Sequence, residues 1–197
     1  MLNRHVIINY IKNQLLYEAE NLCPLTIEAL EDTYYTELEI KLNDESENNI
    51  RIRIGGIIDR IDHANIEGKR QLRIVDYKTS VNIEETNSVS DLFDSQKKKR
   101  SHHRLQAMYY GLACSEKFAE PIGLSLSYVK KAKGELLPLI NVKNVPINDF
   151  SNQYLETYKN QLTSVITEMF DTNKTFKANT NSHNCQYCEF KELCSQK

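Results

Sequence analysis

The sequence predicts a mixed α/β fold in which helices flank a β-sheet. The 197 residues include two apolar, β-branched runs, over 56–62 and 72–79, joined by a short polar turn, which is the pattern of a strand hairpin. Apolar residues recur at helical spacing before and after these runs, in 6–22 and in 150–169. We assign residues 1–180 to a single domain with its own core and residues 181–197 to a cysteine-rich tail.

The first half of the chain is predicted to form a helix followed by strands. Ile7, Ile11, Leu15 and Ala19 lie on one helical stripe, so an amphipathic helix is expected over 6–22. After Pro24 we expect a helical segment over 27–31, a strand over 33–42, a turn over 43–49, a strand over 51–61, a turn over 65–68 and a strand over 72–78.

The second half begins with a long polar segment, residues 79–101, and loops of that length are usually functional or disordered. We then expect a helix over 103–117, strands over 124–128 and 137–142, and a long helix that begins at an Asn148 cap and carries its apolar stripe to Met169.

Two acids and a lysine interrupt the apolar strands: Asp59, Asp76 and Lys78. Since strand side chains alternate, Asp76 and Lys78 point to the same face, and a hairpin makes Asp59 a neighbour of Asp76. Ionised groups in such runs are costly unless they are paired or bound to metal. We predict a Mg²⁺ or Mn²⁺ site for phosphodiester hydrolysis, in which the lysine stabilises developing charge. The alternative is a surface ion-pair lattice on an edge strand.

Composition limits the class of protein. The net charge of -2 argues against a wholly basic nucleic-acid-binding surface but allows a local patch, and residues 97–100, Lys97-Lys98-Lys99-Arg100, are a candidate phosphate contact or a solvated loop. His102 and His103 follow, either facing DNA or solvated. No apolar run reaches the roughly 20 residues needed to span a bilayer and no signal-peptide pattern is present, so a cytoplasmic protein is expected.

Three cysteines crowd the C-terminus as C-x2-C-x5-C: Cys185, Cys188 and Cys194. In a reducing compartment such clustering indicates metal or iron–sulfur ligation rather than disulfides, with zinc and idle thiols as the alternatives. Cys23 and Cys114 stand alone, and Cys114 is expected to be a small core residue.

In their order along the chain, three motifs resemble the PD-(D/E)XK nuclease superfamily: G-I-I-D-R-I-D over 56–62, I-V-D-Y-K-T over 74–79, and Leu105-Gln106 with Tyr110. More narrowly, they are similar to the RecB/AddB-type nuclease domain of bacterial helicase–nucleases. The cysteine tail resembles that of the iron–sulfur branch of this group. The resemblance extends from about Pro24 to Cys194 and implies a restriction-endonuclease-like mixed sheet flanked by helices.

The resemblance also implies roles for individual residues. Asp59 and Asp76 would bind the metal together with the Tyr77 backbone carbonyl, and Lys78 would be the catalytic lysine. An upstream acid normally completes such a site, and Glu31 is expected to supply it as a catalytic and metal-binding residue.

Further roles follow from the same resemblance. Glu28 is the alternative to Glu31 as the upstream acid. Gln106 and Tyr110, one helical turn apart, would lie near the DNA phosphates, or would only support helix packing. A [4Fe-4S] cluster would need a fourth cysteine, for which Cys23 is the upstream candidate.

The implied activity is Mg²⁺-dependent DNA hydrolysis in repair and recombination, with an exonuclease favoured over an endonuclease. The implied partners are DNA and a helicase, as a subunit or as a domain of the same polypeptide, with no membrane. The alternatives are a catalytically inactive nuclease-like DNA-binding or scaffold module, a metal-stapled interaction module, and a CRISPR-associated exonuclease of the same superfamily.

Overall fold

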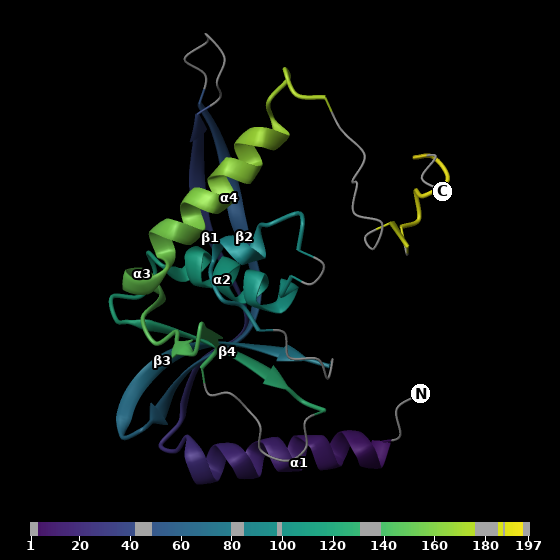
Figure 1. The fold of residues 1–197 in the computed structure, drawn as a ribbon. Coiled ribbons are helices and arrows are strands. Elements are labelled where there is room, and N and C mark those ends of the chain that lie inside the picture. Colours follow the sequence, from purple (N-terminus) through teal and green to yellow (C-terminus); the bar gives the residue numbers. More distant parts are fainter. Residues whose placement is uncertain are drawn as a thin grey trace.

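The computed structural model describes residues 4–41, 49–79, 85–97, 100–130, 139–175, 185–186 and 188–194. Helices and strands alternate along the chain, as the sequence predicts (Figure 1). In order, the elements are α1 (Arg4–Asn21), β1 (Thr26–Lys41), β2 (Asn49–Ile66), β3 (Lys69–Lys78), the 3-10 helix η1 (Ser90–Leu92), α2 (His102–Cys114), β4 (Ile122–Tyr128), β5 (Asn141–Val142), β6 (Val145–Pro146), α3 (Phe150–Gln153) and α4 (Leu155–Met169).

The main sheet has four strands in the order β1-β2-β3-β4. β1 and β2 pair antiparallel, as do β2 and β3, whereas β3 and β4 are parallel with Leu72 opposite Ile122 and Lys78 opposite Tyr128. A parallel pair needs a crossover connection, and the segment that contains α2 provides it. The mixed sheet flanked by helices confirms the predicted fold class.

Helices cover both sides of this sheet. α1 lies along one side, and α2 and α4 lie on the other (Figure 1). α2 contacts all four strands. Its Met108 is fully buried in a cluster with Ile61, Ile74 and Leu124 from three neighbouring strands, and the Tyr158 hydroxyl of α4 donates to the Leu105 carbonyl of α2 at 2.9 Å. The core therefore joins α2 rigidly to the strands that carry the two acids.

The helix predicted over 27–31 is wrong, because these residues belong to β1. Thr26 pairs with His63 and Leu30 pairs with Arg60, with a register shift between Ile27 and Ala29. A five-residue helical tendency is weak, and pairing with a strand thirty residues away overrides it.

The C-terminal half also departs from the predicted boundaries. Asp149, not Asn148, caps the helix by accepting from the Asn152 amide, and the predicted long helix breaks at Tyr154 into α3 and α4. The strand predicted over 137–142 shrinks to β5, with 137 and 138 outside the described residues.

α1 forms where predicted, but its apolar stripe does not face the core. Ile7, Ile11 and Leu15 are 42%, 54% and 59% exposed, and the single buried side chain of the helix is Glu18. α1 therefore attaches to the sheet through polar contacts. No helix in the described part of the chain combines the length and the apolar character that crossing a bilayer requires.

Candidate active site

Asp59 and Asp76 lie at the end of the β2–β3 ladder, close enough for the charge of Asp59 to act on Asp76. The last pair of the ladder is Arg60 with Val75, so one further step in the same register sets Asp59 opposite Asp76. Opposed residues of an antiparallel pair share a face. Asp59 Oδ2 accepts the Tyr77 backbone N–H at 2.7 Å, which holds β3 against this carboxylate just after Asp76. The hairpin thus brings the two acids together.

Lys78 forms an ion pair with Asp76, with 2.5 Å between Nζ and Oδ2. Their side chains are 13% and 5% exposed. Asp76 Oδ2 is buried and accepts no further hydrogen bond from the described residues. Burial raises the pKa of the Asp76 carboxyl, Lys78 lowers it, and the nearby charge of Asp59 adds to the rise, with a net increase above its ordinary value. The pair is therefore buried too deeply to be a surface lattice.

A chain of hydrogen bonds continues from Lys78 into α2. Lys78 Nζ donates to Gln106 Oε1 at 2.7 Å, and Gln106 Nε2 donates to the Tyr110 hydroxyl at 2.8 Å. Burial raises the pKa of Tyr110, the Gln106 hydrogen bond opposes the rise, and the charges of Asp76 and Asp59 add to it. Both α2 residues thus lie beside the two acids.

These residues fit a divalent cation. Two carboxylates and one ammonium leave a net charge of -1 in a poorly hydrated place, and one buried carboxylate oxygen has only Lys78 as its partner. Mg²⁺ uses few protein carboxylates and keeps several waters, so two acids are a sufficient donor set. The Tyr77 carbonyl stays a predicted third ligand.

Glu31 lies next to this site along the sheet but not within it. The pairs Leu30–Arg60 and Asp32–Ile58 bracket Glu31 and Asp59 on adjacent strands. Glu31 is exposed and has a φ of 49°, a left-handed conformation that interrupts the regular strand. Among the described residues, no three His, Cys, Asp or Glu side chains gather as a metal site.

Glu28, the alternative acid, is engaged elsewhere. Its carboxylate lies 2.8 Å from His63 Nδ1 and 3.9 Å from Arg70, and Glu120 lies 2.8 Å from His63 Nε2. The upstream acid therefore stays a prediction, with Glu31 the better placed of the two.

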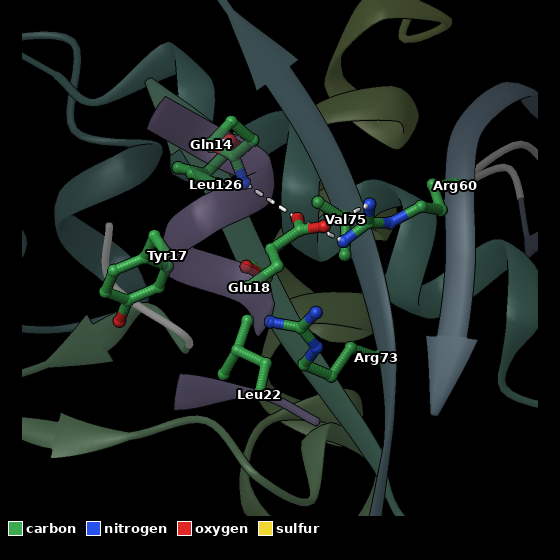
Figure 2. A pocket seen from close by; sticks show the side chains of 10 residues that line it. Gln14, Tyr17, Glu18, Leu22, Arg60, Arg73, Val75 and Leu126 are labelled. Atoms are coloured by element: carbon green, nitrogen blue, oxygen red, sulfur yellow. Dashed lines mark hydrogen bonds and ion pairs between the residues drawn. The ribbon is translucent and has the colours of Figure 1, made fainter. Parts of the chain in front are cut away.

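The opposite face of the same strands carries a buried ion-pair network (Figure 2). Glu18 of α1 receives two hydrogen bonds from Arg60, at 2.7 and 3.2 Å, and Arg60 lies 2.8 Å from Asp62. Arg73 binds both oxygens of Asp62, at 2.9 and 2.8 Å, and the Arg60 guanidinium lies 5.7 Å from the centre of the Tyr77 ring. The network links α1 to β2 and β3 on the face of the sheet opposite Asp59 and Asp76.

Sequence reasoning missed this network, although one signal was present. Arg60, Asp62 and Arg73 are charges inside apolar strand runs, on the face opposite Asp59 and Asp76 by the period of two. Nothing in the helical pattern of α1 singles out Glu18, because its partner lies 42 residues away.

The burial of His103 also differs from the solvated position considered in the sequence analysis. It is 8% exposed, and its Nδ1 lies 3.1 Å from the hydroxyl of Tyr128, which stands beside Lys78 in the sheet. Burial and the positive charges of His102 and Lys78 lower the pKa of His103 to about 4. The solvated alternative is therefore wrong for His103, whereas His102 is exposed.

The predicted basic run is only partly described. Lys97 lies 2.6 Å from Asp91 of η1, a contact that lowers the pKa of Asp91, and Arg100 is exposed. Lys98 and Lys99 lie outside the described residues.

In the described residues, which include all five cysteines, none of the cysteines is in a disulfide. Cys114 is buried in the core, as expected. In the tail, the Cys188 amide donates to the Cys185 carbonyl at 3.3 Å, and the Cys194 amide donates to the Phe190 carbonyl at 3.1 Å. Within the described ranges these thiols do not gather into a metal-binding group, either with one another or with Cys23. A cluster at the tail therefore stays a prediction.

Comparison with known proteins supplies an independent result. No curated protein matches the chain. A family model described as the PD-(D/E)XK nuclease superfamily matches residues 3–195, a range that includes the two acids, Lys78 and all of α2. The chain belongs to the PD-(D/E)XK nuclease superfamily.

Proposed function

We propose that this protein is a Mg²⁺- or Mn²⁺-dependent nuclease that hydrolyses phosphodiester bonds of DNA. The observation that carries the proposal is the cluster at the end of the β2–β3 ladder, where Asp59 accepts the Tyr77 amide N–H and Lys78 is paired with the buried oxygen of Asp76. Membership of a nuclease superfamily supports the same reaction.

In this proposal Asp59 and Asp76 hold the ion, with the Tyr77 carbonyl and Glu31 as further ligands. When bound, the ion polarises a phosphoryl oxygen and lowers the pKa of its water. Lys78 donates hydrogen bonds toward negative charge that develops on the phosphate, in a site from which burial excludes most water. The water oxygen bonds to phosphorus and gives up one proton, one P–O ester bond breaks, and the departing sugar oxygen takes up a proton.

We further propose that DNA approaches over α2. Gln106 and Tyr110 line that side of the acids, and Arg100 with Lys97, Lys98 and Lys99 precedes the helix. The β1 edge is unfavourable to DNA because its exposed residues include Glu28, Glu31 and Asp32.

The finer assignment is a RecB/AddB-type exonuclease of DNA repair and recombination, working in the cytoplasm with a helicase subunit or domain. The order of the motifs G-I-I-D-R-I-D, I-V-D-Y-K-T and Q-x3-Y supports this assignment. Cleavage of an end-labelled linear duplex, compared with a closed circular plasmid, separates exonuclease from endonuclease activity.

For the tail we propose a [4Fe-4S] cluster on Cys185, Cys188, Cys194 and Cys23, with zinc as the alternative. The C-x2-C-x5-C spacing supports metal ligation. Protein purified without oxygen should be brown and contain iron. Colourless protein with stoichiometric zinc would replace the cluster with a zinc site, and metal-free protein would contradict both.

The decisive test of the activity is DNA digestion by Asp76→Ala and Lys78→Ala variants. Each should lose detectable cleavage in Mg²⁺ or Mn²⁺ while keeping its circular dichroism spectrum, and Ca²⁺ should support binding without turnover. Lys174→Ala, a surface change, is the control. Undiminished cleavage by either active-site variant would refute the assignment.

One observation favours a second candidate, a nuclease-like DNA-binding module without catalysis. In the described part of the chain, no third His, Cys, Asp or Glu side chain gathers with Asp59 and Asp76 into a metal-binding group. Specific DNA binding by the unaltered protein, with no cleavage in either metal, would select this alternative.

A further inference from the structure

Gln106 uses both ends of its side-chain amide inside the protein. Its oxygen accepts from Lys78 at 2.7 Å, and its nitrogen donates to the Tyr110 hydroxyl at 2.8 Å. Because an ammonium only donates, the end of the amide that faces Lys78 must be the oxygen, and the nitrogen must then face Tyr110. The orientation of the amide therefore follows from the chemistry of its neighbours.

We infer that Gln106 is a positioning residue, which fixes the Lys78 amine and the Tyr110 hydroxyl relative to the two acids, rather than a DNA contact. This role rests on the proposed nuclease function. It refines the prediction that Gln106 lies at the DNA phosphates, because its side chain spans two other residues of the site.

The two hydrogen bonds that join Lys78, Gln106 and Tyr110, here called the bridge, also restrict the position of the Lys78 side chain. Its Nζ is held by Asp76 at 2.5 Å on the strand and by Gln106 at 2.7 Å on α2, and the side chain is 13% exposed. A long lysine side chain otherwise has many rotamers to lose. Two anchors on different elements hold the amine at a defined place beside Asp76.

The bridge also fixes the direction in which Tyr110 can donate. The phenol oxygen accepts from Gln106, so its own proton is not used in that bond. Tyr110 is half-buried and lies close enough to Asp59 and Asp76 for their charges to act on it. Its O–H is thus available to a phosphate bound at the site, whereas the oxygen and one N–H of the Gln106 amide are already engaged.

A side chain with an acceptor and a donor on one rigid group is needed for this bridge. Glutamine provides both, whereas methionine has a similar length, no donor and only a weakly accepting sulfur. Gln153 of α3 is a matched control, because its amide also uses both ends, accepting from the Asp149 amide at 3.0 Å and donating to the Pro146 carbonyl at 3.1 Å. It lies on a different helix and touches none of the site residues through these bonds.

The first experiment separates positioning from DNA contact with Gln106→Met and Gln153→Met. Single-turnover cleavage of an oligonucleotide in Mg²⁺ should be about 10- to 100-fold slower in Gln106→Met, because small misplacements of catalytic groups cost that much. Affinity for the same oligonucleotide in Ca²⁺ should stay within about twofold, since no hydrogen bond to a charged phosphate is lost. Gln153→Met should change neither quantity.

The opposite pattern would overturn the inference. The second amide hydrogen of Gln106 has no partner among the described residues, and a phosphate contact through it would weaken binding in Ca²⁺ by about tenfold or more. Normal cleavage together with normal binding in Gln106→Met would also overturn it.

A double-mutant cycle tests whether the two halves of the bridge act together. Tyr110→Phe should slow cleavage in the otherwise unaltered protein, but should add less than about threefold to the effect of Gln106→Met, because the hydroxyl is no longer held. Fully multiplicative effects would show that the two residues act separately and would contradict the bridge.

The arrangement can also be tested without activity. In ¹H–¹⁵N spectra, Tyr110→Phe should move the side-chain amide signals of Gln106 and leave those of Gln153 in place. If the unaltered protein does not cleave DNA, the proposed function fails, and this spectrum still decides the bridge. Gln106 signals that do not respond to Tyr110→Phe would overturn it.

Discussion

The Lys78 amine lies 2.5 Å from Asp76 Oδ2, and the two residues stand on the same face of β3, where the charge of Asp59 on β2 also acts on Asp76. The lysine offsets one of two facing carboxylates. A divalent cation would offset the negative charge that remains on the second carboxylate.

Mn²⁺ or Mg²⁺ should raise the melting temperature of the protein, since an ion that binds only the folded state stabilises it. At about 100 times Kd the gain is about 2.7 kcal/mol, which corresponds to about 5–10 °C for a chain of this size. Asp76→Asn should abolish most of the shift, measured by differential scanning fluorimetry. Asp91→Asn is the control, because it removes the charge of an acid that lies on η1 and pairs with Lys97. An unchanged shift in Asp76→Asn would place the ion elsewhere.

The buried ion-pair network of Glu18, Arg60, Asp62 and Arg73 should contribute to the free energy of unfolding. Asp62→Ala removes the partner that Arg73 binds at 2.9 and 2.8 Å, and both side chains are at most 2% exposed. Breaking a buried ion pair by removing one partner costs about 3–5 kcal/mol. The free energy of unfolding in urea measures this loss.

The control for this prediction is the exposed pair of Glu168 and Lys174, which lie 3.2 Å apart. Glu168→Ala should cost at most about 1 kcal/mol, because water and salt screen exposed charges. A loss below about 1 kcal/mol in Asp62→Ala, no larger than that of an exposed pair, would contradict the prediction that the network contributes to stability.

His103 should make the fold sensitive to acid. Burial and nearby positive charge lower its pKa to about 4 from an ordinary value of 6.5. Between these values the unfolded chain binds a proton that the folded protein does not, so stability falls as pH decreases from about 6.5 to about 4. Above pH 6.5 this residue adds no pH dependence.

The measurement is the melting temperature against pH for the unaltered protein and for His103→Asn, which keeps a polar group near Tyr128. Other groups titrate in both proteins, so the difference between the two curves isolates His103. A difference that is flat across this window would show that His103 binds its proton equally well in the folded and unfolded states, and would contradict the lowered pKa.

Arg100 and Lys97 should contribute unequally to DNA binding. Arg100 is exposed, whereas Lys97 is already paired with Asp91 at 2.6 Å. If Arg100 contacts a phosphate, Arg100→Ala should reduce the slope of log Kd against log salt by about 0.7 on single-stranded DNA. Lys97→Ala should have the smaller effect on this slope.

Fluorescence anisotropy in Ca²⁺, over a series of salt concentrations, gives these slopes without cleavage. Lys159→Ala, an exposed change on α4, is the control and should leave the slope unchanged. Equal slopes for Arg100→Ala and the unaltered protein would remove Arg100 from the DNA-binding surface.

The sequence by itself determined the centre of the site. Asp76 and Lys78 share a face because strand side chains alternate, and Asp59 reaches Asp76 because a short turn at 67–68 joins their strands. The helix that carries Gln106 and Tyr110 is also local, because i and i+4 always meet on a helix. Each of these relations depends on short-range geometry.

Only the tertiary structure decided the surroundings of that centre. Residues 27–31 became strand through pairing with β2, and Glu31 was left exposed rather than gathered with the two acids. Glu18 pairs with Arg60, which lies 42 residues away in the sequence, and Gln106 bonds to Lys78, which lies 28 residues away. These contacts depend on how whole elements pack, which no local pattern of residues encodes, because many different packings satisfy the same helical and strand periodicities.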